Sequence, residues 1–183
     1  MSESEKPEGG GGVITAAGLL DLTGIATAAD LARLKNIENA GLVLVREDVQ
    51  SALGGVSVSG VGAVVPVPAG IRVRVQGAQG ALSAAAFAPP DGAQFLLAVS
   101  GQVFVPEPIR EIAYSGVVVT GVVCLPEEGR EAFEQAVTHM QGHVFTYKGK
   151  PRFCAGADTF GRAFLEQLPA GTSLVLFGAF EFA

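Results

Sequence analysis

Residues 101–147 read GQVFVPEPIREIAYSGVVVTGVVCLPEEGREAFEQAVTHMQGHVFTY, and three glycines in this stretch each open an alternating apolar run. Gly101, Gly121 and Gly142 follow one another at a nearly constant spacing of about 20 residues. Alternation with β-branched content after each glycine favours a short strand. The Pro-Glu pairs at 106–107 and 126–127 favour the start of a helical turn. The stretch therefore predicts a repeat of about 20 residues that contains strands and one helical turn.

The same pattern extends over most of the chain. The other glycines that open such runs are Gly18, Gly41, Gly62 and Gly178. The gaps between successive glycines run short, short, long and then short, short, long. Gly18 matches Gly101, Gly41 matches Gly121, Gly62 matches Gly142 and Gly101 matches Gly178, each about 80 residues further along the chain. We interpret this order as an internal duplication into tandem halves, residues 18–100 and 101–183.

The residues between the glycines predict the local elements. Short helical segments are expected where apolar residues recur at helical spacing, over 31–37, 49–53, 109–113 and 130–138. Strand alternation predicts that Val103, Val105, Val123 and Leu125 point inward together. Phe104 and Cys124 would then lie on the opposite face.

A unit of about 20 residues cannot bury its own apolar face, whereas stacked units can. We therefore predict an α/β repeat solenoid, β-rich with short helices, built as two tandem halves of about 80 residues with rungs of about 20. In length and content the chain resembles the leucine-rich-repeat class of solenoid, and residues 164–174, FLEQLPAGTSL, carry the closest local likeness. Glycine corners and valine-rich strands also resemble a β-helix of the kind seen in polymer-forming bacterial proteins. The helical segments fit that second class less well.

Composition excludes several classes of protein. Apolar residues make up 49% of the chain and charged residues 16%, so it can bury a core. The net charge of −6 and the absence of clustered cations argue against nucleic-acid binding. No run reaches the roughly 18 apolar residues of a membrane span. Residues 1–17 are expected to form a disordered, acidic and glycine-rich tail that is no signal peptide, and the predicted location is the cytoplasm.

One set of residues resembles metal ligands. His139 and His143 share the i, i+4 spacing of some ligand pairs, with Cys124 before them and Cys154 after them. The cysteines lack the close spacing of a zinc knuckle, so two core cysteines and two surface histidines are the favoured interpretation. No nucleophile motif or phosphate loop is present in the sequence. We therefore expect no catalysis, no cofactor and no metal.

The two ends of the predicted solenoid suggest self-association. Phe180 and Phe182 share one face of an uncapped strand, and Leu20 and Leu22 lie in the first predicted strand. Arg72 and Arg74 alternate with apolar residues and form a candidate docking patch. The prediction is a non-catalytic structural or protein-interaction scaffold whose partners are proteins, including further copies of itself. The alternatives are a metal-binding protein or enzyme that uses the Cys/His set, and a surface or adhesin module.

Overall fold

The computed structural model describes residues 12–16, 18–77 and 79–183 and divides the chain into two compact units, residues 1–72 and 73–183. Residues 1–11 and 17 of the predicted tail lie outside the described residues, whereas Val13–Thr15 form strand β1. The predicted boundary between residues 100 and 101 falls within strand β9 (Phe95–Phe104).

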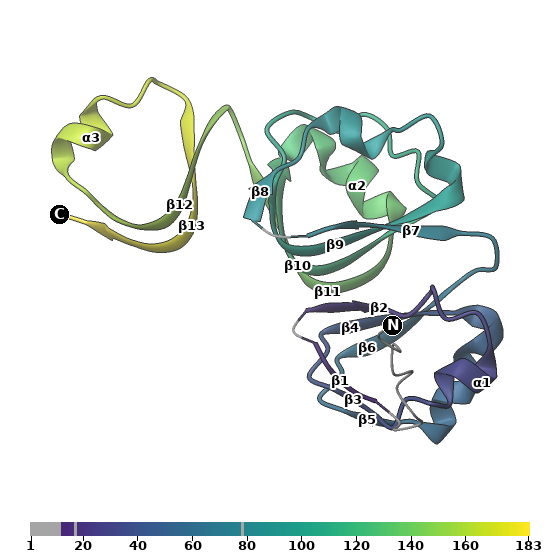
Figure 1. Ribbon diagram of the computed structural model, residues 1–183. Helices are drawn as coiled ribbons and strands as arrows, with labels where there is room; N and C mark the ends of the chain where they lie inside the picture. The colour runs from purple at the N-terminus through teal and green to yellow at the C-terminus, as the bar shows by residue number, and fades with distance from the viewer. Residues whose placement is uncertain (1–11, 17, 78) are drawn as a thin grey trace, which may run out of the picture. The chain divides into compact units, whose positions relative to one another are not determined.

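The first unit contains two three-stranded sheets joined by short helices (Figure 1). Its elements are β1 (Val13–Thr15), β2 (Leu19–Asp21), α1 (Ala28–Leu31), β3 (Asn36–Glu38), β4 (Leu42–Arg46), the 3-10 helix η1 (Glu47–Gly55), β5 (Ser57–Ser59) and β6 (Ala63–Val67). One sheet has the order β1-β3-β5 and the other β2-β4-β6, and all of these pairings are parallel. Paired residues are 23 or 21 positions apart along the chain. The predicted glycine spacing therefore matches strand register in this unit.

Helices of the first unit pack over an apolar cluster. Thr27 caps α1, since its side chain accepts a hydrogen bond from the Asp30 N–H at 3.1 Å. Val49 and Leu53 of η1 are buried against Ile37 and Val43. The helix predicted over 31–37 is wrong beyond Leu31, because Ile37 lies in β3, where burial in a parallel sheet decides its conformation.

The second unit contains a larger parallel sheet and a two-stranded parallel sheet. Its elements are β7 (Arg72–Gln76), β8 (Gln79–Ala81), η2 (Ala84–Phe87), η3 (Gly92–Gln94), β9, β10 (Gly116–Pro126), η4 (Glu127–Gly129), α2 (Arg130–Ala136), β11 (Val137–Tyr147), β12 (Lys150–Phe160), α3 (Arg162–Glu166) and β13 (Thr172–Phe182). The larger sheet has the order β11-β10-β9-β7, with β8 also paired to β9. Strands β12 and β13 form the other sheet. Neither sheet closes on itself within the described residues.

Glycines stand in line across these strands. Gly101, Gly121 and Gly142 are register partners in β9, β10 and β11, and Gly156 is the partner of Gly178 in β12 and β13. In the first unit, the Leu42 N–H donates to the Gly18 carbonyl at 2.8 Å. A Cβ on Gly121, whose φ is +137°, would lie 2.1 Å from the Gly101 carbonyl oxygen. Glycine is thus required at this corner by both conformation and space.

The core of the second unit confirms the predicted strand faces. Val103, Val105, Val123 and Leu125 belong to one buried cluster with Phe133 of α2. Phe104 and Cys124 belong to a different cluster on the other face. Residues 109–113 form no helix, which corrects the prediction there. Pro108 constrains the residue before it, and so short a segment alone nucleates a helix poorly.

Among the described residues, no helix combines the length and the apolar character needed to cross a bilayer.

Candidate self-association surface

The β12–β13 sheet carries the predicted self-association residues Phe180 and Phe182. Both strands are 11 residues long and pair along their whole length, from Lys150 opposite Thr172 to Phe160 opposite Phe182. No other strand of the described residues pairs with either edge. A parallel sheet of two strands with both edges open is unusual, because parallel sheets are normally covered and two-stranded sheets are only marginally stable alone.

An aromatic cluster lies along this sheet near the end of both strands. The Phe160 ring is stacked between the rings of Phe164 and Phe180, with centroids 4.2 and 5.4 Å away. The Phe182 ring is 5.6 Å from that of Phe160 and tilted by 55°. Arg152 places its guanidinium carbon 4.6 Å from the Phe164 centroid, within cation–π range. The rings of this cluster are unequally buried, since Phe160 is 5% exposed whereas Phe182 is 52% exposed.

Helix α3 leaves this cluster only partly covered. No residue of α3 is buried, and Leu165 is 42% exposed. By contrast, α2 buries Phe133 completely beneath the larger sheet. The side of the β12–β13 sheet that faces α3 therefore still exposes apolar area that a further layer would bury.

The opposite side of the same sheet is already packed. Phe153, Val175 and Phe177 cluster with Phe104 and Tyr147 of the larger sheet. The Phe104 and Phe153 rings stack at 4.9 Å with an interplanar angle of 12°. This contact anchors the β12–β13 sheet within the second unit and leaves its edges as the open surface.

Buried polar groups near this contact are satisfied or neutral. The Tyr147 hydroxyl donates to the Val105 carbonyl at 2.7 Å. Burial, assisted by the nearby Cys124 and Glu128, raises the pKa of Tyr147 to about 12. Burial also raises the pKa of the Cys124 thiol, which opposes formation of the thiolate.

The predicted residues Leu20 and Leu22 occupy a different environment from the phenylalanines. Leu22 is buried in the core of the first unit, and Leu20 packs against that core half-buried. The Leu22 N–H donates to the Leu44 carbonyl at 2.8 Å. Self-association through this segment would therefore have to use the backbone edge of β2.

The two arginines of the predicted basic patch lie in different environments. Arg72 is exposed on β7, whereas Arg74 is half-buried. The Arg74 guanidinium lies 4.4 Å from the Phe95 ring centroid and 3.5 Å from an Asp91 carboxylate oxygen. Arg74 thus already has partners within its own unit.

The predicted metal-like residues are not gathered into one site. Cys124 is buried among aromatic residues, and Cys154 lies half-buried on β12 opposite Leu176. His143 is exposed, while the Nε2 atom of His139 is buried with no hydrogen-bond partner in the part of the chain that the structure describes. Residues 12–16, 18–77 and 79–183 hold no group of three or more His, Cys, Asp or Glu side chains that could bind a metal ion.

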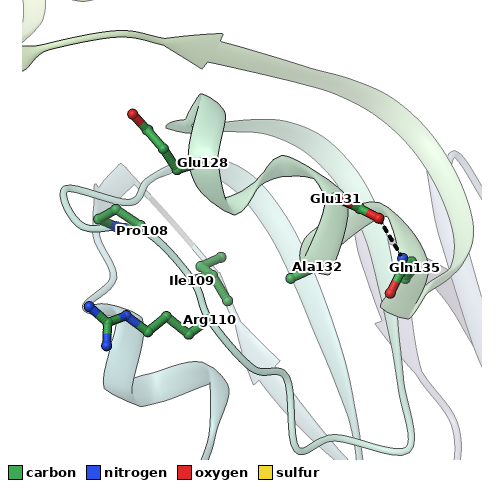
Figure 2. Close-up of a pocket in the computed structure, with 7 residues that line it drawn as sticks. All are labelled: Pro108, Ile109, Arg110, Glu128, Glu131, Ala132 and Gln135. Carbon is green, nitrogen blue, oxygen red and sulfur yellow. Dashed lines mark hydrogen bonds between the residues drawn. The ribbon is translucent and has the colours of Figure 1, made fainter.

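A shallow hollow of about 540 Å³ lies beside α2 (Figure 2). Its polar lining residues include Arg110, Glu128 and Glu131, and the Gln135 amide donates to the Glu131 carboxylate at 3.2 Å. The side chains of Arg110 and Glu128 extend in different directions in Figure 2. These two charged groups therefore do not converge on one point of the hollow.

Sequence reasoning missed Gly156 and Phe160, which are the register partners of Gly178 and Phe182. Each pair is separated by about 20 residues, as the glycines are elsewhere. That spacing was the signal that could have revealed both partners.

Comparisons with known proteins give no match for this chain among family models, curated proteins or solved structures.

Proposed function

We propose that this protein is a non-catalytic structural scaffold that associates with further copies of itself. The proposal includes a repeat architecture in which each rung of about 20 residues adds one strand to a parallel sheet. Register offsets of 23 and 21 in the first unit, 20 along the β9–β10 pairing and 22 in the β12–β13 sheet support that view. Aligned glycines at the corners support it further.

The observation that carries the proposal is the two-stranded sheet β12–β13 with both edges open. Neither edge has a strand paired to it along its 11 residues within the described part of the chain, and such edges are templates for pairing with another chain. An exposed phenylalanine, Phe182, adds apolar surface at one edge. A contact that joins two different edges is heterologous, and it generates rings or filaments rather than only dimers.

The proposal also places this scaffold in the cytoplasm with protein partners only. The two free cysteines and the acidic net charge support that location and argue against nucleic-acid partners. Fractionation of cells that express the full chain tests the location, and recovery with the membrane or surface fraction would contradict it.

The experiment that tests self-association is light scattering of the purified protein at tens of micromolar, roughly the range where weak contacts form. We expect a mass above that of the 18.7 kDa chain, rising with concentration. A mass of one chain at every concentration would contradict the scaffold proposal. Negative-stain microscopy then distinguishes rings from filaments.

A further inference from the structure

We propose that the open edge of β13 in one copy pairs in parallel with the open edge of β12 in a second copy, with Gly178 opposite Gly156. This inference rests on the proposed self-association and specifies the joint that performs it. Each copy contributes one edge of each kind, so the joint repeats from copy to copy and extends the sheet as β12-β13-β12-β13.

Backbone directions show which groups each edge presents. The Lys150 N–H donates to the Gly171 carbonyl at 3.0 Å, and the Ala183 N–H donates to the Phe160 carbonyl at 3.1 Å. Because successive residues of a strand direct their backbone groups to opposite edges, even-numbered residues of β12 face β13 and odd-numbered residues face outward. On β13 the even-numbered residues face outward.

The proposed register fits this alternation. In a parallel pair, a residue that faces its neighbour exchanges hydrogen bonds with the residues on either side of its register partner. Gly178 of one copy would thus bond to Ala155 and Ala157 of the next, which are odd-numbered and face outward. A shift by one residue would break this match along the whole edge.

The Thr159 N–H provides a direct sign that the β12 edge lacks a backbone partner. It donates to the Asp158 Oδ1 at 2.8 Å, a side-chain acceptor on its own strand. Pro151, which has no N–H to offer, also sits at an outward-facing position of this strand.

The aligned glycines show that the space beside Gly156, at the open edge of β12, is free of protein atoms in the described part of the chain. A Cβ on Gly121, Gly142 or Gly178 would lie 2.1, 1.9 or 1.7 Å from the carbonyl oxygen of the glycine on the preceding strand. A Cβ on Gly156 would meet nothing within 4 Å, although its φ of +109° resembles the corner conformation of Gly101 at +90°. The space beside Gly156 is therefore where another glycine carbonyl belongs, and Gly178 carries the outward carbonyl of this same sheet.

Side chains along the proposed joint are compatible. Phe182 would lie between Phe160 of its own chain and Phe160 of the next, which buries its exposed ring. Phe180 would lie opposite Asp158, and Glu181 opposite Thr159. No pair of like charges meets directly across the joint, and such pairs are what a sheet avoids.

Strand β11 of the same chain cannot cover the β12 edge in parallel. Only Lys148 and Gly149 separate the two strands, and the chain from Tyr147 to Lys150 spans at most about 10 Å. For β12 to pair in parallel with β11, the first residue of β12 would have to lie beside the first residue of β11. Because β11 is 11 residues long, its first residue lies about 36 Å from the end at which the connection to β12 starts. The partner for this edge must therefore come from another segment, and the matching edge of β13 in a second copy supplies it.

The decisive test mixes two variants with one introduced cysteine each, Ala157→Cys and Ala179→Cys, both in a Cys154→Ala background that leaves only the buried Cys124 besides. Within one chain these positions are register partners, so the proposed joint repeats the same pairing between chains. Adjacent strands are about 4.8 Å apart, within disulfide range, whereas two copies of one position are separated by two strand spacings. Under oxidation by diamide we expect covalent dimers in the mixture and none in either variant alone.

A substitution gives an independent measure. Phe182→Asp should weaken self-association at least tenfold in light scattering, because a carboxylate would enter the aromatic stack. Phe145→Asp is the matched control, since Phe145 is 55% exposed on β11 and lies outside the joint. The control should assemble like the natural chain.

The outcomes separate the joint from the general proposal. An assembling natural chain with no cross-link in the mixture, or with Phe182→Asp assembling as well as Phe145→Asp, would overturn the joint and leave the scaffold proposal intact. A natural chain that stays monomeric would overturn both. Should Phe182→Asp fail to fold by circular dichroism, the cysteine mixture decides alone.

Discussion

The Tyr147 hydroxyl is a buried donor whose ionisation the fold opposes. It donates to the Val105 carbonyl at 2.7 Å, and its pKa is raised to about 12 from an ordinary value near 10. The folded state therefore holds this proton more tightly than the unfolded state does. The resulting stabilisation is complete below about pH 10 and is lost as the pH rises from there towards 12.

This predicts a specific loss in Tyr147→Phe. Near pH 7 the variant should be less stable by about 1 kcal/mol, because the Val105 carbonyl loses its partner. Between pH 10 and 12 the natural chain should lose stability more steeply than the variant, so the gap between them narrows. Urea denaturation at several pH values measures both. Parallel stability curves through this range would show that Tyr147 titrates normally.

Gly121 has no room for a side chain, since a Cβ would approach the Gly101 carbonyl oxygen to 2.1 Å. Gly121→Ala should cost about 2 kcal/mol or more, from the left-handed φ and from displacement of the neighbouring strand. Gly77→Ala is the control, because a Cβ there meets nothing within 4 Å. Thermal melts should separate the two variants, and equal melting temperatures would contradict the corner assignment.

At the scale of elements, the two faces of strand β10 pack into two different apolar clusters. Val123 is fully buried in the cluster with Phe133, while Cys124 packs with Phe104 on the other face. Val123→Asp places a charge in that core without a partner and should abolish soluble folding. Val75→Asp on β7, where the valine is 47% exposed, should fold and remain soluble. A Val123→Asp variant that melts like the natural chain would mean that these faces are reversed.

Sequence patterns predicted elements well where one physical cause acts alone. Alternation predicted the inward face of β9 and β10, and i, i+4 spacing predicted helix α2 with only its last turn misplaced. Prediction was wrong over 109–113, where Ile109 is buried without any helix, because tertiary packing overrides weak local propensity.

At the scale of the whole molecule, the glycine spacing predicted the register between neighbouring strands. It did not predict which sheet faces pack against each other. Gly101, Gly121 and Gly142 align as their near-constant spacing predicts. The stacking of Phe104 on Phe153 joins residues that are far apart in the chain, and no periodicity in the sequence indicates that contact. Likewise, Arg74 looked free in an alternating strand, and only the fold brings Phe95 and Asp91 to it.

The proposed joint uses open sheet edges of the second unit for pairing between copies of the chain. Hydrogen exchange of β13 at two protein concentrations tests this most directly, because the two sides of the strand serve as internal controls. Odd-numbered residues donate or accept within the chain and should be protected at both concentrations. We predict that the N–H groups of Leu174, Leu176, Phe180 and Phe182 exchange quickly in dilute protein and slowly at tens of micromolar, roughly where association sets in. Exchange at these positions that is equally fast at both concentrations would contradict the account.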